Sequence, residues 1–363
     1  MLNTANLSLE QAPPISVPFR FFLTAPLFGI AASLLLAWYG PEVLTSRLAP
    51  QALALTHLLT IGFLALVMCG ALLQMLPVLA GIAVPRVVLV GGLSHLLLSV
   101  GTVGLAGGFL SGSQLWLKFA VVFLAMGFFI YIPAVVTALW RVRMANATVT
   151  GMRMALLALI VTVMLGIILA ATLVGWVTLG FPLLFTDIHL TWGMLGWVAL
   201  LLIGVSFQVV PMFQVTPEYP IWMKLWLTRL LLIGLAIWTM LYATAVKDQS
   251  SLGWSSLFLI GLFAGYILFA ITTMRLQQRR RRKIVDVTLM FWRIGIAGIP
   301  LSVLVWISGR LFPALTTVVD LDLLLGVCML FGSAIPLMNG MLYKIVPFLS
   351  WFHLQNRQLA TMC

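Results

Sequence analysis

Three stretches of this 363-residue chain share one pattern: GFLALVMCGALLQMLP at 62–77, GWVALLLIGVSFQVVP at 196–211 and GSAIPLMNGMLYKIVP at 332–347. Each stretch opens with Gly, has a second Gly after seven residues, then Gln or Lys, and closes with Pro. The prolines stand 211 − 77 = 134 and 347 − 211 = 136 residues apart, which is far longer than a solenoid repeat. The pattern therefore indicates a multi-helix unit that has been triplicated, with pseudo-threefold internal symmetry.

The shared positions of this pattern fall on one face of an ideal α-helix. At about 100° per residue they lie near 0°, 80°, 120° and 60°. Small residues on such a stripe let neighbouring helices approach closely, and the proline predicts a helix end nearby. We expect the stripe to be a packing or lining surface.

The composition excludes a soluble globule. Hydrophobic residues make up 63% of the chain and charged residues 8%, with a mean hydropathy of +1.16. Apolar runs long enough to cross about 30 Å of hydrocarbon predict an all-α polytopic membrane protein with ten spans. The predicted spans are 20–39, 52–80, 86–109, 115–140, 153–176, 188–212, 222–245, 253–274, 287–308 and 321–350.

The distribution of cations predicts the orientation, because cytoplasmic loops of membrane proteins are rich in Lys and Arg. The cations of the even-numbered loops are Arg86, Arg141, Arg143, Arg153, Lys224, Arg279, Arg280, Arg281, Arg282 and Lys283. We therefore expect both termini on the cytoplasmic side of the membrane. The net charge of +12 is attributed to this topology and not to nucleic acid. The segment before Arg20 does not resemble a cleaved signal.

The pattern lies in the second, sixth and tenth predicted spans. The chain is thus predicted to form a single membrane domain, 1–363, of three repeat units at about 20–140, 150–275 and 286–353. The first two units have four spans each, and the third stops after two.

Two of the four histidines stand at similar depth in the predicted membrane. His57 and His189 each lie about 30 Å from the proline of their copy, near the outer leaflet. On an α-helical wheel they point about 220° and 20° from the first pattern glycine, and opposite faces of neighbouring helices in a threefold ring can look into one space. Two facing imidazoles are what an axially ligated heme requires. The alternative is that His57 caps a helix start through Thr56 and that His189 bonds Asp187.

Other side chains are weaker candidates for this site. Asp187 and Thr191 would lie next to the ligand His189 without binding the cofactor themselves. Met194, one turn after His189, is a candidate for a further ligand. Cys328 lies near the level of His57 and is a soft ligand suited to copper, or else a small buried residue. His95 is expected to be hydrogen-bonded in the helix packing, and His353 to be interfacial. The cysteines Cys69, Cys328 and Cys363 have no CxxC spacing and predict neither a disulfide framework nor a zinc site.

The stretch DIHLTWGMLGWVALLLIGVSFQVVPMF at 187–213 resembles the heme-ligand helix of heme-copper oxidase catalytic subunits, most closely those of C-type oxidases and nitric oxide reductases. His189 matches the first histidine of that family's His-x-His pair, with Thr191 at the second. His57 matches the second, with Leu55 at the first. LPVLAGIAVPR at 76–86 is similar to the loop that follows the ligand helix. The resemblance implies three arcs of four helices with hemes in the outer half of the membrane.

The resemblance also implies an incomplete set of ligands. The tenth span has Leu325 and Val327 where the family has a histidine pair. We therefore expect at most one b-type heme or one metal site, and not a complete oxidase. A looser similarity links the chain to membrane proteins of the NnrS type, which are tied to nitric oxide stress.

Three hypotheses of function follow. The first is a heme b protein with His57 and His189 as axial ligands, which transfers electrons or binds nitric oxide or oxygen beside a redox partner or respiratory subunit. The second is a copper or heme handling protein that uses His57, His189, Cys328 and Met194. The third is a degenerate structural subunit or permease without a cofactor.

Overall fold

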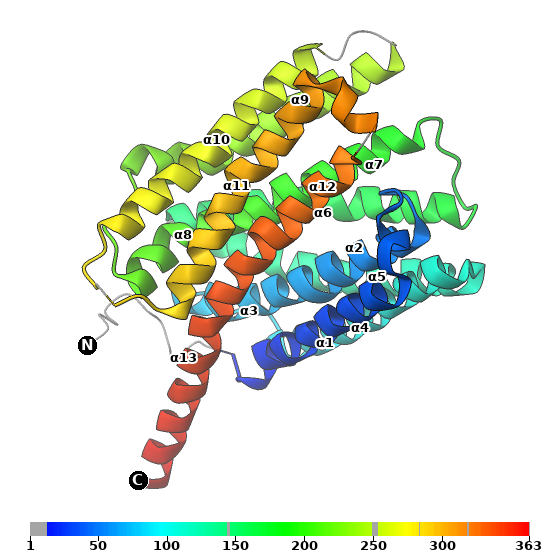
Figure 1. The fold of residues 1–363 in the computed structure, drawn as a ribbon. Helices are drawn as coiled ribbons and strands as arrows, with labels where there is room; N and C mark the ends of the chain where they lie inside the picture. Colours follow the sequence, from blue (N-terminus) through cyan, green and yellow to red (C-terminus); the bar gives the residue numbers. More distant parts are fainter. Residues whose placement is uncertain (1–12, 144–145, 249–252, 283, 318, 363) are drawn as a thin grey trace. The chain divides into compact units, whose positions relative to one another are not determined.

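The computed structural model describes residues 13–143, 146–248, 253–282, 284–317 and 319–362. Within this part of the chain, ten helices are long and apolar enough to cross a membrane, so the predicted all-helical polytopic architecture and the predicted number of spans are confirmed (Figure 1). The chain divides into two compact units, residues 1–144 with 338–363 and residues 145–337. Two residues considered above, Lys283 and Cys363, lie outside the described residues.

The first unit contains the first copy of the glycine pattern. Its elements are α1 (Ser16–Tyr39), the 3-10 helix η2 (Gly40–Leu44), α2 (Pro50–His57), the π-helical segment η3 (Leu58–Ala65), α3 (Leu66–Ala80), α4 (Val87–Ser111) and α5 (Gln114–Arg141). Helices α4 and α5 pack closely because glycines of α4 receive side chains of α5. A Cβ atom on Gly101 would lie 2.7 Å from Leu124 Cγ, and one on Gly108 would lie 2.7 Å from Leu117 Cδ2.

The second unit contains the second copy of the glycine pattern and the start of the third. Its elements are α6 (Ala147–Leu173), α7 (Pro182–Thr191), the π-helical segment η4 (Trp192–Val198), α8 (Ala199–Gln214), the π-helical segment η5 (Met223–Leu227), α9 (Thr228–Lys247), α10 (Gly253–Gln278), α11 (Val287–Leu311), the 3-10 helix η6 (Pro313–Thr317), α12 (Leu321–Val327) and the π-helical segment η7 (Cys328–Ala334). The last helix, α13 (Ile335–Met362), begins in this unit and ends in the other.

Helix starts follow familiar capping chemistry. Asn146 begins α6 and Asp286 begins α11, and each side-chain oxygen accepts a 2.9 Å hydrogen bond from the backbone N–H three residues later. Asp320 caps α12 in the same way. The other two pattern helices start with Pro50 and Pro182 at the first turn, where the missing proline N–H costs no helical hydrogen bond.

All three pattern helices contain a π-helical segment at the same place. Each segment begins four residues before the first pattern glycine: 58 against 62 in η3, 192 against 196 in η4 and 328 against 332 in η7. A π segment is a rare local insertion in an α-helix and is frequent at functional sites. Three of them in one register give the sequence repeat a local structural counterpart.

The glycine stripe is a packing surface that faces the preceding span in each repeat. In the first copy, a Cβ on Gly62 would lie 2.4 Å from the ring of Phe28 on α1. In the second, a Cβ on Gly204 would lie 2.7 Å from Gly151 Cα on α6. In the third, Gly332 lies against Gly298 of α11. The expected close approach of helices is thus confirmed.

The prolines close two of the three pattern helices. Helix α3 ends three residues after Pro77 and α8 three residues after Pro211. Helix α13 instead continues from Pro347 to Met362, so the prediction of a nearby helix end is wrong for the third copy. The first two helices end in residues with left-handed backbone, Gly81 and Val215, whereas the third proline is followed by a run without Gly or Pro.

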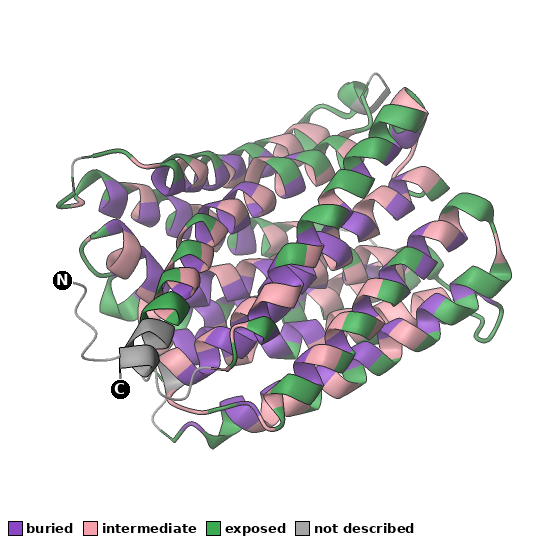
Figure 2. Cartoon of the chain, turned by 90° about the horizontal axis from the view of Figure 1, so that it is seen from below, coloured by how far each residue is buried: buried purple, intermediate pink, exposed green. Residues whose placement is uncertain are grey.

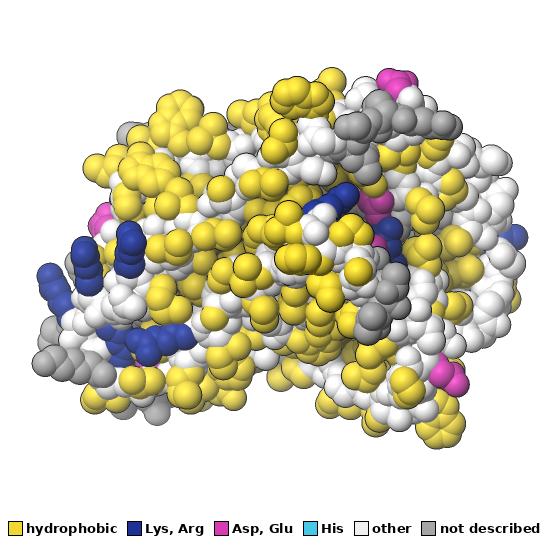
Figure 3. Space-filling view, turned by 45° about the horizontal axis from the view of Figure 1, so that its top comes forward, with side chains coloured by type: hydrophobic (Ala, Val, Ile, Leu, Met, Phe, Trp, Pro, Cys, Tyr) yellow, Lys and Arg dark blue, Asp and Glu magenta, His cyan; other side chains and the backbone are white. Residues whose placement is uncertain are grey.

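The outer surfaces of the helices are strongly apolar. Buried and exposed faces alternate along the helices in Figure 2, and hydrophobic side chains cover much of the face in Figure 3. Large residues such as Trp38, Phe129 and Trp254 are more than three-quarters exposed. In water this surface would be unstable, whereas lipid tails solvate it without cost.

Candidate cofactor-ligand histidines

His57 is the last residue of α2 and stands directly before the π-helical segment η3. Its side chain is half-buried, and its Nδ1 lies 2.7 Å from the backbone oxygen of Leu53, one turn earlier in the same helix. The ring of Phe109 on α4 lies over it, with 5.5 Å between centroids. Helix α2 begins at Pro50, so the alternative in which His57 caps a helix start is wrong.

His189 lies near the end of α7, before η4, and is held by the neighbouring helix α6. Its Nδ1 is 3.0 Å from the backbone oxygen of Thr162. The ring lies against Gly166, where a Cβ atom would be 3.0 Å from Cε1 of the imidazole. The position of this ring therefore depends on how α6 packs against α7.

Polar contacts fasten the first turns of this second pattern helix to α9. Asp187 Oδ2 accepts a 2.6 Å hydrogen bond from the hydroxyl of Tyr242, whose ring is stacked on Trp238. Trp192 Nε1 donates to Thr239 Oγ1 at 2.8 Å. Thr191, at the register of the second family histidine, donates its hydroxyl to the backbone oxygen of Asp187. These contacts fix the segment that carries His189 between two helices.

Hydrogen bonds to backbone carbonyls fix the same tautomer for His57 and His189. A backbone carbonyl only accepts hydrogen bonds, so Nδ1 of His57 and of His189 must carry the proton and donate it. In a neutral imidazole the lone pair available to a metal is then on Nε2. Metal-binding histidines typically donate their other ring N–H to a carbonyl or carboxylate in this way.

The π-helical segments change the directions predicted for these side chains. The angles of about 220° and 20° assume a uniform α-helix, but η3 and η4 lie between each histidine and its pattern glycine. A π-helix turns less per residue than an α-helix, so that premise is wrong. His57 belongs to the first unit and His189 to the second, and the prediction that they share one heme stays a prediction.

The remaining candidates have different surroundings. His95 Nε2 lies 2.9 Å from Thr24 Oγ1, and the His95 ring meets the Phe21 ring edge-on at 5.2 Å, which confirms its packing role. His353 is exposed. Cys328 is the first residue of η7 and is buried, and Met194 is half-buried within η4.

No group of three or more His, Cys, Asp and Glu side chains that could hold a metal ion is found among the residues the structure describes. Among these residues, the copper hypothesis is therefore not supported by a cluster of three such side chains. A bis-imidazole ligand pair needs only two side chains and is not addressed by this finding.

Two positions that govern His189 were not singled out from the sequence. Thr162 supplies the carbonyl and Gly166 the space for the ring. Both lie in an apolar span far from the pattern, and a backbone acceptor leaves no signature in residue type. Only the packing of α6 on α7 identifies them.

The fold and this site define the class as a polytopic α-helical membrane protein with a triplicated, π-containing helix. No protein-family model matches the chain, and no curated protein matches it significantly.

Proposed function

We propose that this protein is a b-type heme protein of the bacterial inner membrane, with a fold like that of heme-copper oxidases. It would transfer electrons or bind nitric oxide or oxygen, in respiration or in nitric oxide stress, and it is not a complete oxidase. His57 and His189 would supply the axial ligands. The observation that carries the proposal is that both rings have Nδ1 bonded to a backbone carbonyl, at 2.7 and 3.0 Å.

The residues around the two histidines suit this role. The carbonyls of Leu53 and Thr162 fix the tautomer and the ring, so that Nε2 keeps its lone pair. The ring of Phe109 lies over His57 and limits the access of water to it. A bound heme would supply one-electron transfer if both axial positions stay filled, or gas binding if one is labile.

The third pattern helix supports the proposal that the protein has only one heme site. At the register of the histidine pair it has Leu325 and Val327, whose side chains cannot bind a metal. The copy that lacks ligands still has its π-helical segment η7. A cofactor is thus proposed for the two copies that have a histidine, and the third is assigned a structural role.

The decisive experiment is the reduced-minus-oxidised visible spectrum of the purified protein, with a pyridine hemochrome assay and metal analysis. We expect about one heme b per chain, lost in His57→Ala and in His189→Ala. The matched controls are His95→Ala, which removes a packing histidine, and His353→Ala, which removes an exposed one, and both should keep the heme. A colourless wild-type protein without iron would contradict the proposal, and copper in its place would favour the metal-handling alternative.

A second variant tests the positioning of His189 without removing it. Gly166→Val places methyl groups where the imidazole lies, so we expect heme content to fall several-fold. In Gly261→Val the new side chain meets open space, because nothing lies within 4 Å of a Cβ there, and heme content should be unchanged. Equal heme content in the two variants, at equal yield and helicity, would contradict the role of α6.

A further inference from the structure

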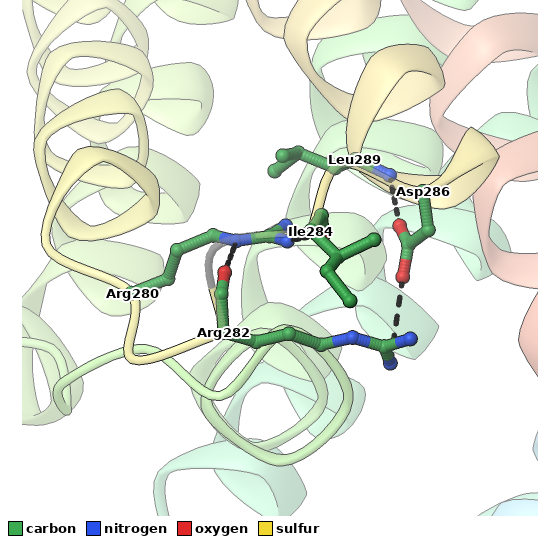
Figure 4. Close-up of polar contacts among 5 residues, drawn as sticks. All are labelled: Arg280, Arg282, Ile284, Asp286 and Leu289. Carbon is green, nitrogen blue, oxygen red and sulfur yellow. Dashed lines mark hydrogen bonds and ion pairs between the residues drawn. The ribbon is translucent and has the colours of Figure 1, made fainter.

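The connection between α10 and α11 is a folded basic loop. Arg280 donates from Nε to the backbone oxygen of Arg282 and from Nη2 to that of Ile284 (Figure 4). Arg282 Nη1 lies 3.9 Å from Asp286 Oδ2, and Asp286 Oδ1 accepts a 2.9 Å hydrogen bond from the N–H of Leu289. Arg280 and Asp286 therefore shape the loop.

This basic loop is also attached to the connector that follows the second pattern helix. The N–H of Arg281 donates a 3.0 Å hydrogen bond to the backbone oxygen of Val215. Val215 has a φ of 54°, in the left-handed region, which directs the chain out of α8. The arginines of the loop are thus presented in a fixed arrangement within the second unit.

Arginines and aliphatic side chains are exposed together on this loop. Arg279, Arg281 and Arg282 are exposed, as is Arg275 one turn earlier on α10. Beside them, Ile284 is 70% exposed, Val285 55% and Val287 49%. The basic loop directly joins two membrane-spanning helices, so both kinds of side chain stand at the level where a membrane passes from headgroups to acyl chains.

A cytoplasmic bias of cations explains how many arginines the loop has but not its folded form or its aliphatic residues. Guanidinium groups bind phosphate oxygens through paired N–H donors. Aliphatic side chains beside them would be covered by the acyl boundary below the headgroup. A nucleic acid would satisfy the arginines and leave Ile284 and Val285 in water.

We propose that residues 279–282 and 284–287 form a binding surface for the phosphodiester headgroups of anionic phospholipids. Arg279 and Arg281 are the cations that contact the phosphate, and Arg282 shares its charge with Asp286. Arg280 positions the loop from within through its bonds to two carbonyls. Ile284, Val285 and Val287 enter the acyl boundary.

The test is native mass spectrometry of the detergent-purified full chain titrated with phosphatidylglycerol or phosphatidylcholine. We expect wild type to retain phosphatidylglycerol preferentially. Arg279→Gln with Arg281→Gln should weaken that binding about 25-fold, since each of the two cations near a membrane surface contributes about fivefold. The control pair, Arg141→Gln with Arg143→Gln, removes two exposed arginines elsewhere and should retain the lipid.

A second double variant separates the effect of positive charge from that of the guanidinium shape. It also keeps the loop cationic, so the charge bias that orients the protein in the membrane is unchanged. Arg279→Lys with Arg281→Lys keeps the positive charge and should bind the lipid with an affinity between that of wild type and the Gln pair. Equal lipid retention by wild type and the Gln pair would overturn the proposal, and so would equal loss in the control pair. Binding of a single-stranded oligonucleotide in preference to phosphatidylglycerol would overturn it in favour of nucleic acid.

Discussion

The first two pattern helices are mostly enclosed by other parts of the protein, whereas fewer residues of the third are buried. In the most apolar 18-residue windows of the three spans, 78% and 67% of residues are buried in the first two and 22% in the third. All three contain a π-helical segment in one register, so the local backbone is the same and the surroundings differ. The histidines stand in the two enclosed copies.

The same glycine stripe meets different partners in the three copies. Gly70 lies against the Cβ atom and ring of the buried Phe21, whereas Gly204 and Gly151 bring two backbones together. On Gly332 a Cβ would be in ordinary contact with Gly298 at 3.7 Å. The repeat has thus kept the space that small residues create, while the partner that fills it has changed.

The largest effect is expected at the enclosed second copy. In Gly204→Ala the new methyl group would lie 2.7 Å from Gly151 Cα, and neither backbone can move aside within the bundle. We expect a loss of about 3 kcal/mol in the free energy of unfolding, measured by denaturant titration of the purified protein in detergent. A loss below about 0.5 kcal/mol, the range of neutral surface changes, would show that the two helices are free to separate.

The third copy, in which fewer residues are buried, allows the two sides of a single contact to be compared. A Cβ on Gly298 would lie 2.1 Å from the backbone oxygen of Gly332, whereas a Cβ on Gly332 would meet only an ordinary contact. We expect Gly298→Ala to cost about 2 kcal/mol, less than in the second copy, because fewer residues of the third pattern helix are buried and it can shift more easily. Gly332→Ala should stay within about 0.5 kcal/mol. The same titration measures both, and equal costs would contradict the asymmetry.

The spans were predictable because length and apolar composition decide them. The triplicated pattern also predicted which helices are equivalent and which face of them packs. The π-helical segments were not predictable, since their residues are as apolar and as helix-compatible as their neighbours. Their presence invalidates the α-helical wheel, so the directions of His57 and His189 could not be derived from sequence.

The surroundings of the histidines show a second limit of sequence reasoning. The Leu53 carbonyl that holds His57 is one helical turn away, so a helix alone brings the two together. The Thr162 carbonyl that holds His189 is 27 residues away in another helix. Contacts of the second kind depend on packing between spans, which residue types do not encode.

The smallest effect is expected in the connector after the second pattern helix. Lys224 Nζ lies 2.7 Å from Glu218 Oε2, and this hydrogen bond lowers the pKa of the Glu218 carboxyl from its ordinary value of 4.5. A lowered pKa in the folded state stabilises the protein above the ordinary value, and this contribution is lost as the pH falls through the lowered one. Because the Glu218 side chain is 77% exposed, the pair should contribute less than about 0.5 kcal/mol.

Lys224→Gln tests this pair by removing the donor while leaving the carboxyl. The wild-type melting temperature should fall slightly more than that of Lys224→Gln between about pH 6 and about pH 3, where carboxyls titrate. Lys118→Gln removes an exposed lysine of α5 and should follow the wild type. If Lys224→Gln and Lys118→Gln show the same pH dependence, the connector is held by the buried Tyr219, whose hydroxyl lies 2.9 Å from Thr273 Oγ1. The enclosed second copy would then owe its ordered connector to buried packing, as it owes the contact of its helices to Gly151 and Gly204.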